Sequence, residues 1–348
     1  MTAVPAASPA GADPVLAVRD LRVTFDGPAG PVRAVDGVTF DLRPAEVLAV
    51  VGESGSGKSV TAMTLLGLTR GQARRIEGEV RYGGRNLLDL PDRDLRPVRG
   101  AEIAMVFQDP MTSLNPTKTV GRQIVDVLRL HTGASRAQAR GRAVELLEEV
   151  GIPQPRRRVD AYPHEFSGGM RQRAMIAMAI ACEPSVLIAD EPTTALDVTI
   201  QAQVLELLAR LRETHGTAVV LITHDLGIVA DLADRVAVMY AGRLVEQAAR
   251  DRLFYTPQHP YTWGILASVP RIDRAKAARL TPIEGTPPAL DALPAGCAFR
   301  DRCPVAFDRC VEPPPLEPRS APDHLDACWR DPAERSALRA RAHPEVPA

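Results

Sequence analysis

Short apolar runs separated by polar residues fill the first part of the chain, at residues 16–18, 21–25 and 38–42. Gly-Pro pairs at 27–28 and 30–31 interrupt this pattern, which predicts antiparallel strands joined by turns. The run at 47–51 is apolar throughout and predicts a buried strand. A glycine-rich loop and a predicted helix over residues 59–68 follow it, so we expect strand, loop and helix in succession.

Strand-sized and helix-sized apolar patterns alternate farther along the chain. Strands are predicted at 103–107, 186–189 and 218–222, helices at 171–182 and 200–214, and a helical region over about 120–150. Ser167 is a suitable N-cap for the helix at 171–182. Strands that alternate with helices imply parallel pairing, with functional residues at their carboxyl ends. The expected fold class is therefore α/β.

The composition changes near residue 250. Ten prolines fall between residues 282 and 322, and four of the five cysteines follow residue 296. This pattern favours a loop-rich extension without a large core of its own. We expect a tail at 1–14, a main domain at 15–250 with a helical subdomain at about 110–182, and an extension at 251–348.

Bulk composition excludes several classes of protein. The 348 residues carry 42 basic and 43 acidic side chains, so no overall field draws the protein to nucleic acid. The longest apolar runs are strand-sized, and residues 1–14 lack the basic start and apolar core of a secretion signal. An odd number of cysteines fits a reducing compartment. We therefore expect a cytoplasmic protein that does not itself cross a membrane.

Residues 52–59 read Gly-Glu-Ser-Gly-Ser-Gly-Lys-Ser, which is a phosphate-binding loop. Its glycines let backbone N–H groups turn toward phosphate oxygens, and the helix that follows adds its positive end. Lys58 reaches the outer phosphates, although the chain holds 39 arginines and only three lysines. The predicted ATP-binding residues of the loop are Gly52, Ser54, Gly55, Gly57, Lys58 and Ser59.

Polar residues at the ends of the other strands complete a phosphoryl-transfer site. Asp190 is expected to hold Mg²⁺ through water and Ser59 to bind it directly. Glu191 is positioned to deprotonate or orient the attacking water. Gln108 is expected to contact the metal and the water, and His224 is expected to reach the γ-phosphate. Each residue alone is more commonly a satisfied polar group, but five such features in order indicate ATP hydrolysis.

The motifs at 52–59, Gln108, 166–170, 190–191, 195–197 and His224 together resemble those of the ATP-binding-cassette (ABC) ATPases. The resemblance covers about residues 15–250 and implies a P-loop NTPase fold with a mixed sheet core, an antiparallel β subdomain and a helical subdomain. It also implies that two such domains sandwich two ATP molecules.

Further residue roles follow from that resemblance. Ser167, Gly168 and Gly169 would bind the nucleotide held by the other domain, and Asp197 of the short loop at 195–197 is also expected to bind ATP. The free N–H groups at this helix end are a suitable anion receptor. Met170 stands where the family signature has glutamine. Phe25 is the candidate ring that stacks on adenine, with Phe40 as the alternative.

Three segments resemble the oligopeptide/dipeptide importer branch, namely residues 108–116, 166–173 and 256–262. That branch implies an external solute-binding protein, two permeases and two ATPase chains, often non-identical. The chain would then lie on the cytoplasmic side of the membrane as a peripheral subunit. Peptides are the favoured cargo, with nickel or another small solute as alternatives.

Cys297, Cys303, Cys310 and Cys328 are spaced more widely than the pairs of ordinary zinc sites. Similar tails in this importer branch suggest a [4Fe–4S] cluster with a structural role. Unligated thiols or zinc are the alternatives. Cys182, in the predicted helix at 171–182, is expected to be a small hydrophobic residue.

Two other functions compete with transport. One is a non-transport cassette ATPase acting on nucleic acid or ribosomes, which commonly carries two cassettes or basic arms. The other is a P-loop kinase or G protein, which would leave residues 166–170 and His224 unexplained. A single cassette with a net charge of −1 favours the importer.

Overall fold

The computed structural model describes residues 13–28, 30–194, 196–268 and 283–343. Residues 1–12 of the predicted tail lie outside this range. The chain divides into two compact units, each assembled from several stretches. The first unit comprises residues up to 16, 41–47 and 81–222, and the second comprises 17–40, 48–80 and residues from 223 onward.

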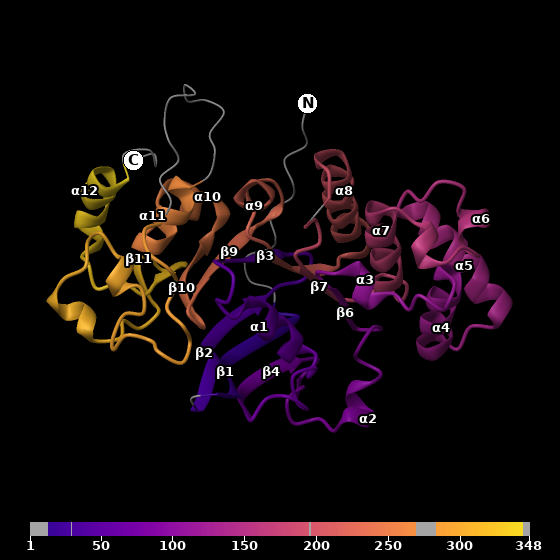
Figure 1. Ribbon diagram of the computed structural model, residues 1–348, viewed down its shortest axis with the longest axis horizontal. Helices are drawn as coiled ribbons and strands as arrows, with labels where there is room; N and C mark the ends of the chain where they lie inside the picture. Colours follow the sequence, from indigo (N-terminus) through magenta and orange to yellow (C-terminus); the bar gives the residue numbers. More distant parts are fainter. Residues whose placement is uncertain (1–12, 29, 195, 269–282, 344–348) are drawn as a thin grey trace. The chain divides into compact units, whose positions relative to one another are not determined.

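Three parallel strands form the centre of the first unit, β6 (Ile103–Val106), β7 (Val186–Asp190) and β8 (Ala218–Ile222). Every residue in them is buried, because their apolar side chains point to covered faces on both sides. The helices of this unit that Figure 1 labels are α2 (Asp92–Leu95), α3 (Pro110–Ser113), α4 (Val120–Thr132), α5 (Arg136–Glu149), α6 (Pro155–Arg158), α7 (Gly168–Ala179) and α8 (Val198–His215). The 3₁₀ turn η1 (Pro163–Glu165) precedes α7.

The predicted helical region over about 120–150 consists of two helices. Gly133 ends α4 in the left-handed conformation, at φ 67°. Ser135 then begins α5 with a capping box, in which its side chain and that of Gln138 bond to each other's backbone N–H. The predicted helix at 171–182 was too long, since α7 ends at Ala179. Cys182 therefore lies beyond the helix, half-buried, and burial raises the pKa of its thiol.

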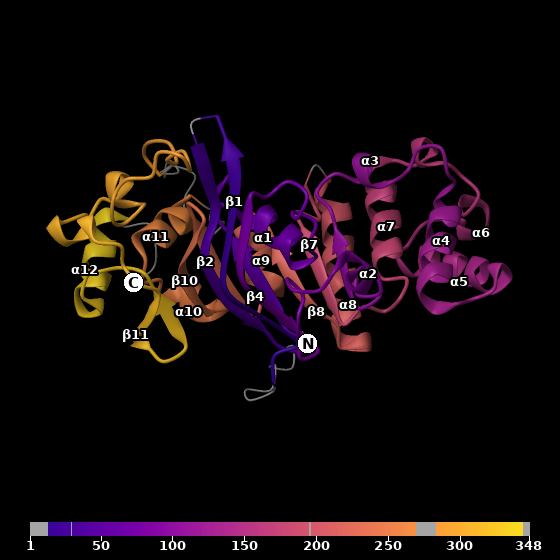
Figure 2. The ribbon, with the colours of Figure 1, turned by 90° about the horizontal axis from the view of Figure 1, so that it is seen from below.

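An antiparallel sheet of the second unit contains β1 (Leu16–Gly27), β2 (Gly30–Leu42) and β4 (Arg75–Tyr82), and the short β5 (Arg85–Asn86) pairs with the end of β4. Figure 2 shows β1 between β2 and β4. The two apolar runs at 16–18 and 21–25 thus belong to one continuous strand. The Gly-Pro pairs mark the turn between β1 and β2, in agreement with the prediction.

The mixed sheet also includes β3 (Val47–Val51), which pairs in parallel with β9 (Arg235–Tyr240) in this unit. The antiparallel strands β10 (Arg243–Ala249), β12 (His324–Asp326) and β11 (Glu317–Ala321) continue it in that order. The remaining helices are α1 (Lys58–Leu65), α9 (Leu226–Leu232), α10 (Arg250–Tyr255), α11 (Pro260–Ala267), α12 (Pro332–Ala342) and the 3₁₀ turns η2 (Arg300–Arg302) and η3 (Asp308–Val311). The observed α/β fold, with a mixed and an antiparallel sheet, is the one expected.

Residues after 250 share the core of the mixed sheet. Leu253, Tyr261 and Phe299 are buried in one cluster with Val236 and Val238 of β9. The proposed boundary at residue 250 and the helical subdomain at about 110–182 stay predictions. Among the described residues, no helix combines the length and apolar character that a membrane span requires.

A buried carboxylate joins β10 to the residues that follow it. Glu246 is fully buried, accepts hydrogen bonds from the backbone N–H of Gln258 at 2.6 Å and of His259 at 2.9 Å, and pairs with His324 Nε2 at 2.6 Å. Burial lowers the pKa of His259 to about 4, so this imidazole is neutral near pH 7. Its Nδ1 accepts from Tyr261 N and caps α11. Polar contacts therefore supplement the apolar cluster in holding the extension to β10.

Candidate functional site

The phosphate loop at 52–59 follows β3 in the second unit, and α1 begins at Lys58. Gly57 adopts φ 100°, and a Cβ there would collide with the carbonyl oxygen of Ala34. A Cβ on Gly52 would meet the carbonyl oxygen of Met239 in the same way. Only glycine fits either position, which explains this part of the motif.

The loop presents its outer residues to solvent and holds its lysine inside. Ser54 and Gly55 are exposed, whereas Lys58 is 6 % exposed. Lys58 Nζ donates to the carbonyl oxygens of Gly52 at 2.7 Å and Glu53 at 2.8 Å. The ammonium group is therefore fixed within the loop, where an outer phosphate would be bound.

In the first unit, the ends of the parallel strands bring Gln108 and Glu191 together. Gln108 Nε2 donates to Glu191 Oε2 at 2.8 Å, and Thr194 Oγ1 donates to the same oxygen at 2.9 Å. Glu191 has φ 47°, a left-handed backbone that is uncommon for this residue type. Asp190 directly before it ends β7 and is 5 % exposed. Two carboxylates thus follow one buried strand in different surroundings.

The predicted anion receptor lies at an exposed helix end in the same unit. Ser167 caps α7 by accepting from Met170 N at 3.3 Å, and Ser167 and Gly168 are exposed. Gly169 packs against Ile200 of α8, where a Cβ would approach Ile200 Cγ2 to 2.8 Å. Asp197 caps α8 by accepting from Ile200 N at 3.0 Å. Ala195 of the predicted loop at 195–197 lies outside the described residues.

His224 and Phe25 belong to the second unit. His224 is exposed and follows Thr223, whose backbone N–H donates to Val50 O of β3 at 3.3 Å. Phe25 is half-buried on β1, whereas Phe40 is 3 % exposed and part of the core. Phe25 thus has the more accessible ring, although its contact with adenine stays a prediction.

The predicted site residues are divided between the two units. The phosphate loop, Phe25 and His224 lie in the second unit. The first unit contains the other predicted residues, which are Gln108, Ser167, Gly168, Gly169, Asp190, Glu191 and Asp197. Their joint action on one nucleotide stays a prediction.

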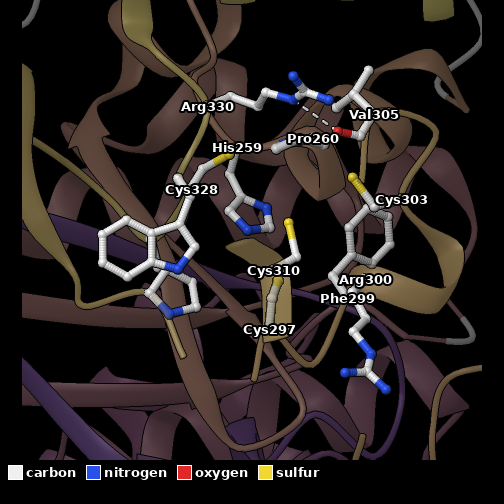
Figure 3. A pocket seen from close by; sticks show the side chains of 13 residues that line it. His259, Pro260, Cys297, Phe299, Arg300, Cys303, Val305, Cys310, Cys328 and Arg330 are labelled. Carbon is white, nitrogen blue, oxygen red and sulfur yellow. Dashed lines mark hydrogen bonds between the residues drawn. The ribbon is translucent and has the colours of Figure 1, made fainter. Parts of the chain in front are cut away.

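Cys297, Cys303, Cys310 and Cys328 line one pocket of the extension, shown in Figure 3. All four are free thiols and half-buried. Burial raises the pKa of Cys303 to about 12 and that of Cys328 to about 11, and it also raises the pKa of Cys297. In the described part of the chain, no three His, Cys, Asp or Glu side chains are grouped so that they could hold a metal ion.

Two residues of the extension contact the phosphate loop and were not identified as site residues from the sequence. Tyr261 Oη accepts from Glu53 N at 2.8 Å, and Arg302 pairs with the Glu53 carboxylate at 2.7 Å. Tyr261 lies within the segment at 256–262, but no local signal links it to the loop. Arg302 belongs to no motif.

Comparisons with known proteins agree with these features. Residues 35–194 match the family model described as "ABC transporter", and residues 245–310 match that described as "Oligopeptide/dipeptide transporter, C-terminal region". The probable peptide ABC transporter ATP-binding protein y4tR of Sinorhizobium fredii is 54% identical over 92% of this chain and 96% of its own length. For the oligopeptide transport ATP-binding protein OppD of Salmonella typhimurium, the identity is 53% over 93% and 96%, respectively.

Solved structures are similar over about two thirds of the chain. The ATP-binding cassette MJ0796, in a dimeric post-hydrolysis state bound to ADP and Pi, has a TM-score of 0.61 and 28% sequence identity. This similarity covers 68% of this chain and 98% of that one.

Proposed function

This chain belongs to the ABC transporter family and is an ABC-type ATPase, and from this we propose that it powers the uptake of oligopeptides or dipeptides. The observation that carries the cargo proposal is the match of residues 245–310 to the C-terminal region of oligopeptide/dipeptide transporters. Two relatives whose names state a peptide cargo match this chain over nearly the whole length of both sequences.

In the proposed mechanism the phosphate loop holds ATP and the strand ends carry the chemistry. Lys58 and the loop N–H groups bind the outer phosphates. The oxygen donors of Ser59, Gln108 and Asp190 suit Mg²⁺, which would neutralise phosphate charge. Glu191 takes the proton of the attacking water, and Gln108, which donates to Glu191, orients that water. His224 contacts the γ-phosphate.

The second half of each composite site comes from another chain. Ser167, Gly168 and Gly169 present an exposed helix end suited to an anion. We propose that it faces the nucleotide of a second, non-identical ATPase subunit, and that two permeases and an external solute-binding protein complete the importer. The assembly places this chain at the cytoplasmic side of the membrane.

Purification of the native complex from membranes tests this function. We expect two hydrophobic permease chains and a second ATPase to copurify, and ATP hydrolysis to rise severalfold when a peptide-loaded binding protein is added. If nickel or another solute stimulated ATP hydrolysis and peptides did not, that solute would be the cargo instead of peptides. Copurification with nucleic acid or ribosomes and without permeases would overturn the transport function.

We also propose that Cys297, Cys303, Cys310 and Cys328 hold a [4Fe–4S] cluster with a structural role. The observation that supports this proposal is that the four cysteines line one pocket of the extension (Figure 3). Each cysteine of such a cluster binds a different iron, so the sulfurs need not converge on one ion as they do around zinc.

Iron and acid-labile sulfide assays on anaerobically purified protein test the cluster. We expect about four of each per chain, and a loss of both in Cys310→Ser. Cys182→Ser, a thiol outside the pocket, should retain both. Zinc in place of iron, or no metal at all, would refute the proposal.

A further inference from the structure

The extension contacts the phosphate loop at Glu53. Arg302 Nη1 donates to Glu53 Oε2 at 2.7 Å, and Arg302 Nη2 donates to Oε1 at 3.0 Å. The Arg302 side chain is 7 % exposed and that of Glu53 is 30 % exposed. A bidentate pair of this kind fixes direction as well as distance. All of these residues belong to the second unit.

Tyr261 holds the backbone of the same residue. Its hydroxyl accepts from Glu53 N at 2.8 Å, and the side chain is fully buried on α11. Burial raises the pKa of this phenol, so it is neutral at physiological pH. The carbonyl oxygen of Glu53 accepts from Lys58 Nζ at 2.8 Å. One loop residue is therefore bound by the extension through its side chain and its N–H, and by the phosphate-binding lysine through its carbonyl.

Arg302 is itself held in place before it reaches the loop. Its Nε donates to Glu284 O at 2.9 Å, and Nη1 also donates to Tyr240 Oη at 3.3 Å. The guanidinium lies near the rings of Tyr240 and Phe299, with its carbon 5.9 Å and 6.0 Å from the ring centres. Because these contacts order the side chain, little conformational freedom remains to be lost when it binds Glu53.

A cavity of about 390 Å³ lies on the same loop. Residues 53–56 and Tyr240 form part of its lining, and residues 287–291 of the extension form another part. The extension thus borders open space at the loop that binds phosphate, in addition to holding Glu53. This position is the second observation that links it to nucleotide binding.

We propose that Arg302 and Tyr261 are positioning residues for ATP binding, which act by holding the phosphate loop through Glu53. The proposal rests on the ATP-binding role of the loop and is independent of the cargo. A loop held in its binding shape loses less entropy when ATP binds, so loss of either contact weakens binding more than it changes the chemical step.

The test compares variants of the full chain in its membrane complex. For Arg302→Gln we expect the Kd and the KM for ATP to rise about tenfold, with kcat at saturating ATP within about twofold of wild type. Tyr261→Phe removes only a hydroxyl from a buried ring and should raise the Kd about threefold to fivefold. Arg302→Lys keeps the charge without the fork and should fall between Arg302→Gln and wild type.

Arg252→Gln is the matched control, because Arg252 of α10 pairs with Asp323 at 3.0 Å, and in the described part of the chain no hydrogen bond or ion pair joins either residue to the loop. It should leave the Kd unchanged. If Arg302 had a merely structural role, its substitution would lower the melting temperature and leave the Kd for ATP within twofold of wild type. That result in both Arg302→Gln and Tyr261→Phe would overturn the proposal. A complex that binds ATP normally but whose ATP hydrolysis does not respond to peptides would refute the proposed cargo and not this inference.

The pair itself is tested by a double-mutant cycle. If Arg302 acts through Glu53, then Glu53→Gln raises the Kd for ATP, and adding Arg302→Gln has little further effect. Fully independent effects, in which the two fold-changes multiply, would exclude Glu53 as the link.

Discussion

Replacing Glu191 by glutamine is expected to leave ATP binding intact and to lower turnover in the assembled complex about 100-fold or more. Glu191 accepts from Gln108 and Thr194 through one oxygen, and the amide oxygen of glutamine can accept in its place. The side chain therefore stays in position, but a neutral amide cannot take a proton from water. Equilibrium ATP binding and phosphate release, measured on the same preparation, separate the two effects.

Glu183→Gln is the control for that experiment. It makes the same change of charge at a glutamate with a similar left-handed backbone, φ 51° against 47° for Glu191. Glu183 pairs with Arg142 at 3.5 Å and has no predicted catalytic role. Its variant should turn over ATP within about twofold of wild type. Wild-type hydrolysis by Glu191→Gln would remove Glu191 from its assigned role as general base.

Replacing Glu246 by alanine is expected to lower the free energy of unfolding by about 3–5 kcal/mol. The carboxylate is fully buried and bonded to Gln258 N, His259 N and His324 Nε2. Its removal leaves these three groups without their acceptor in a site that water does not reach. Chemical denaturation followed by circular dichroism measures the loss.

Glu317→Ala is the comparison variant. Glu317 lies on β11 with 56 % of its side chain exposed and pairs with Arg319 at 3.5 Å. Exposed pairs of this kind contribute at most about 1 kcal/mol. Equal midpoints for Glu246→Ala and wild type would show that the buried contacts of Glu246 do not stabilise the fold.

For the strands and helices predicted up to residue 222, local sequence signals failed mainly at helix ends, whereas β9, β10 and the later elements were not predicted. The strand, phosphate loop and helix near residue 50 form as predicted, but α1 ends at Leu65 and not at residue 68. Gly67 adopts φ 63° just beyond it, and a glycine at this position is a recognised stop signal. Pro184 also follows α7, but it lies beyond Cys182 and does not by itself place the end of the helix at Ala179.

Contacts between distant parts of the chain could not be predicted in this way. Gln108 and Glu191 were both found because each follows a buried parallel strand, and parallel topology brings such ends together. No such topological rule brings Arg302 and Glu53 together. Arginine is the commonest basic residue here, and nothing local distinguishes Arg302 from the many that form surface pairs.

The pairing of β12 with β10 has a consequence for the order in which the chain folds. β10 leaves the ribosome well before β12, and during that interval its outer main-chain groups have no strand beside them. Bare edges of this kind invite pairing with another chain. Nascent chains of this protein can therefore self-associate during this interval. We expect their dependence on chaperones to be greatest just before the last segment emerges.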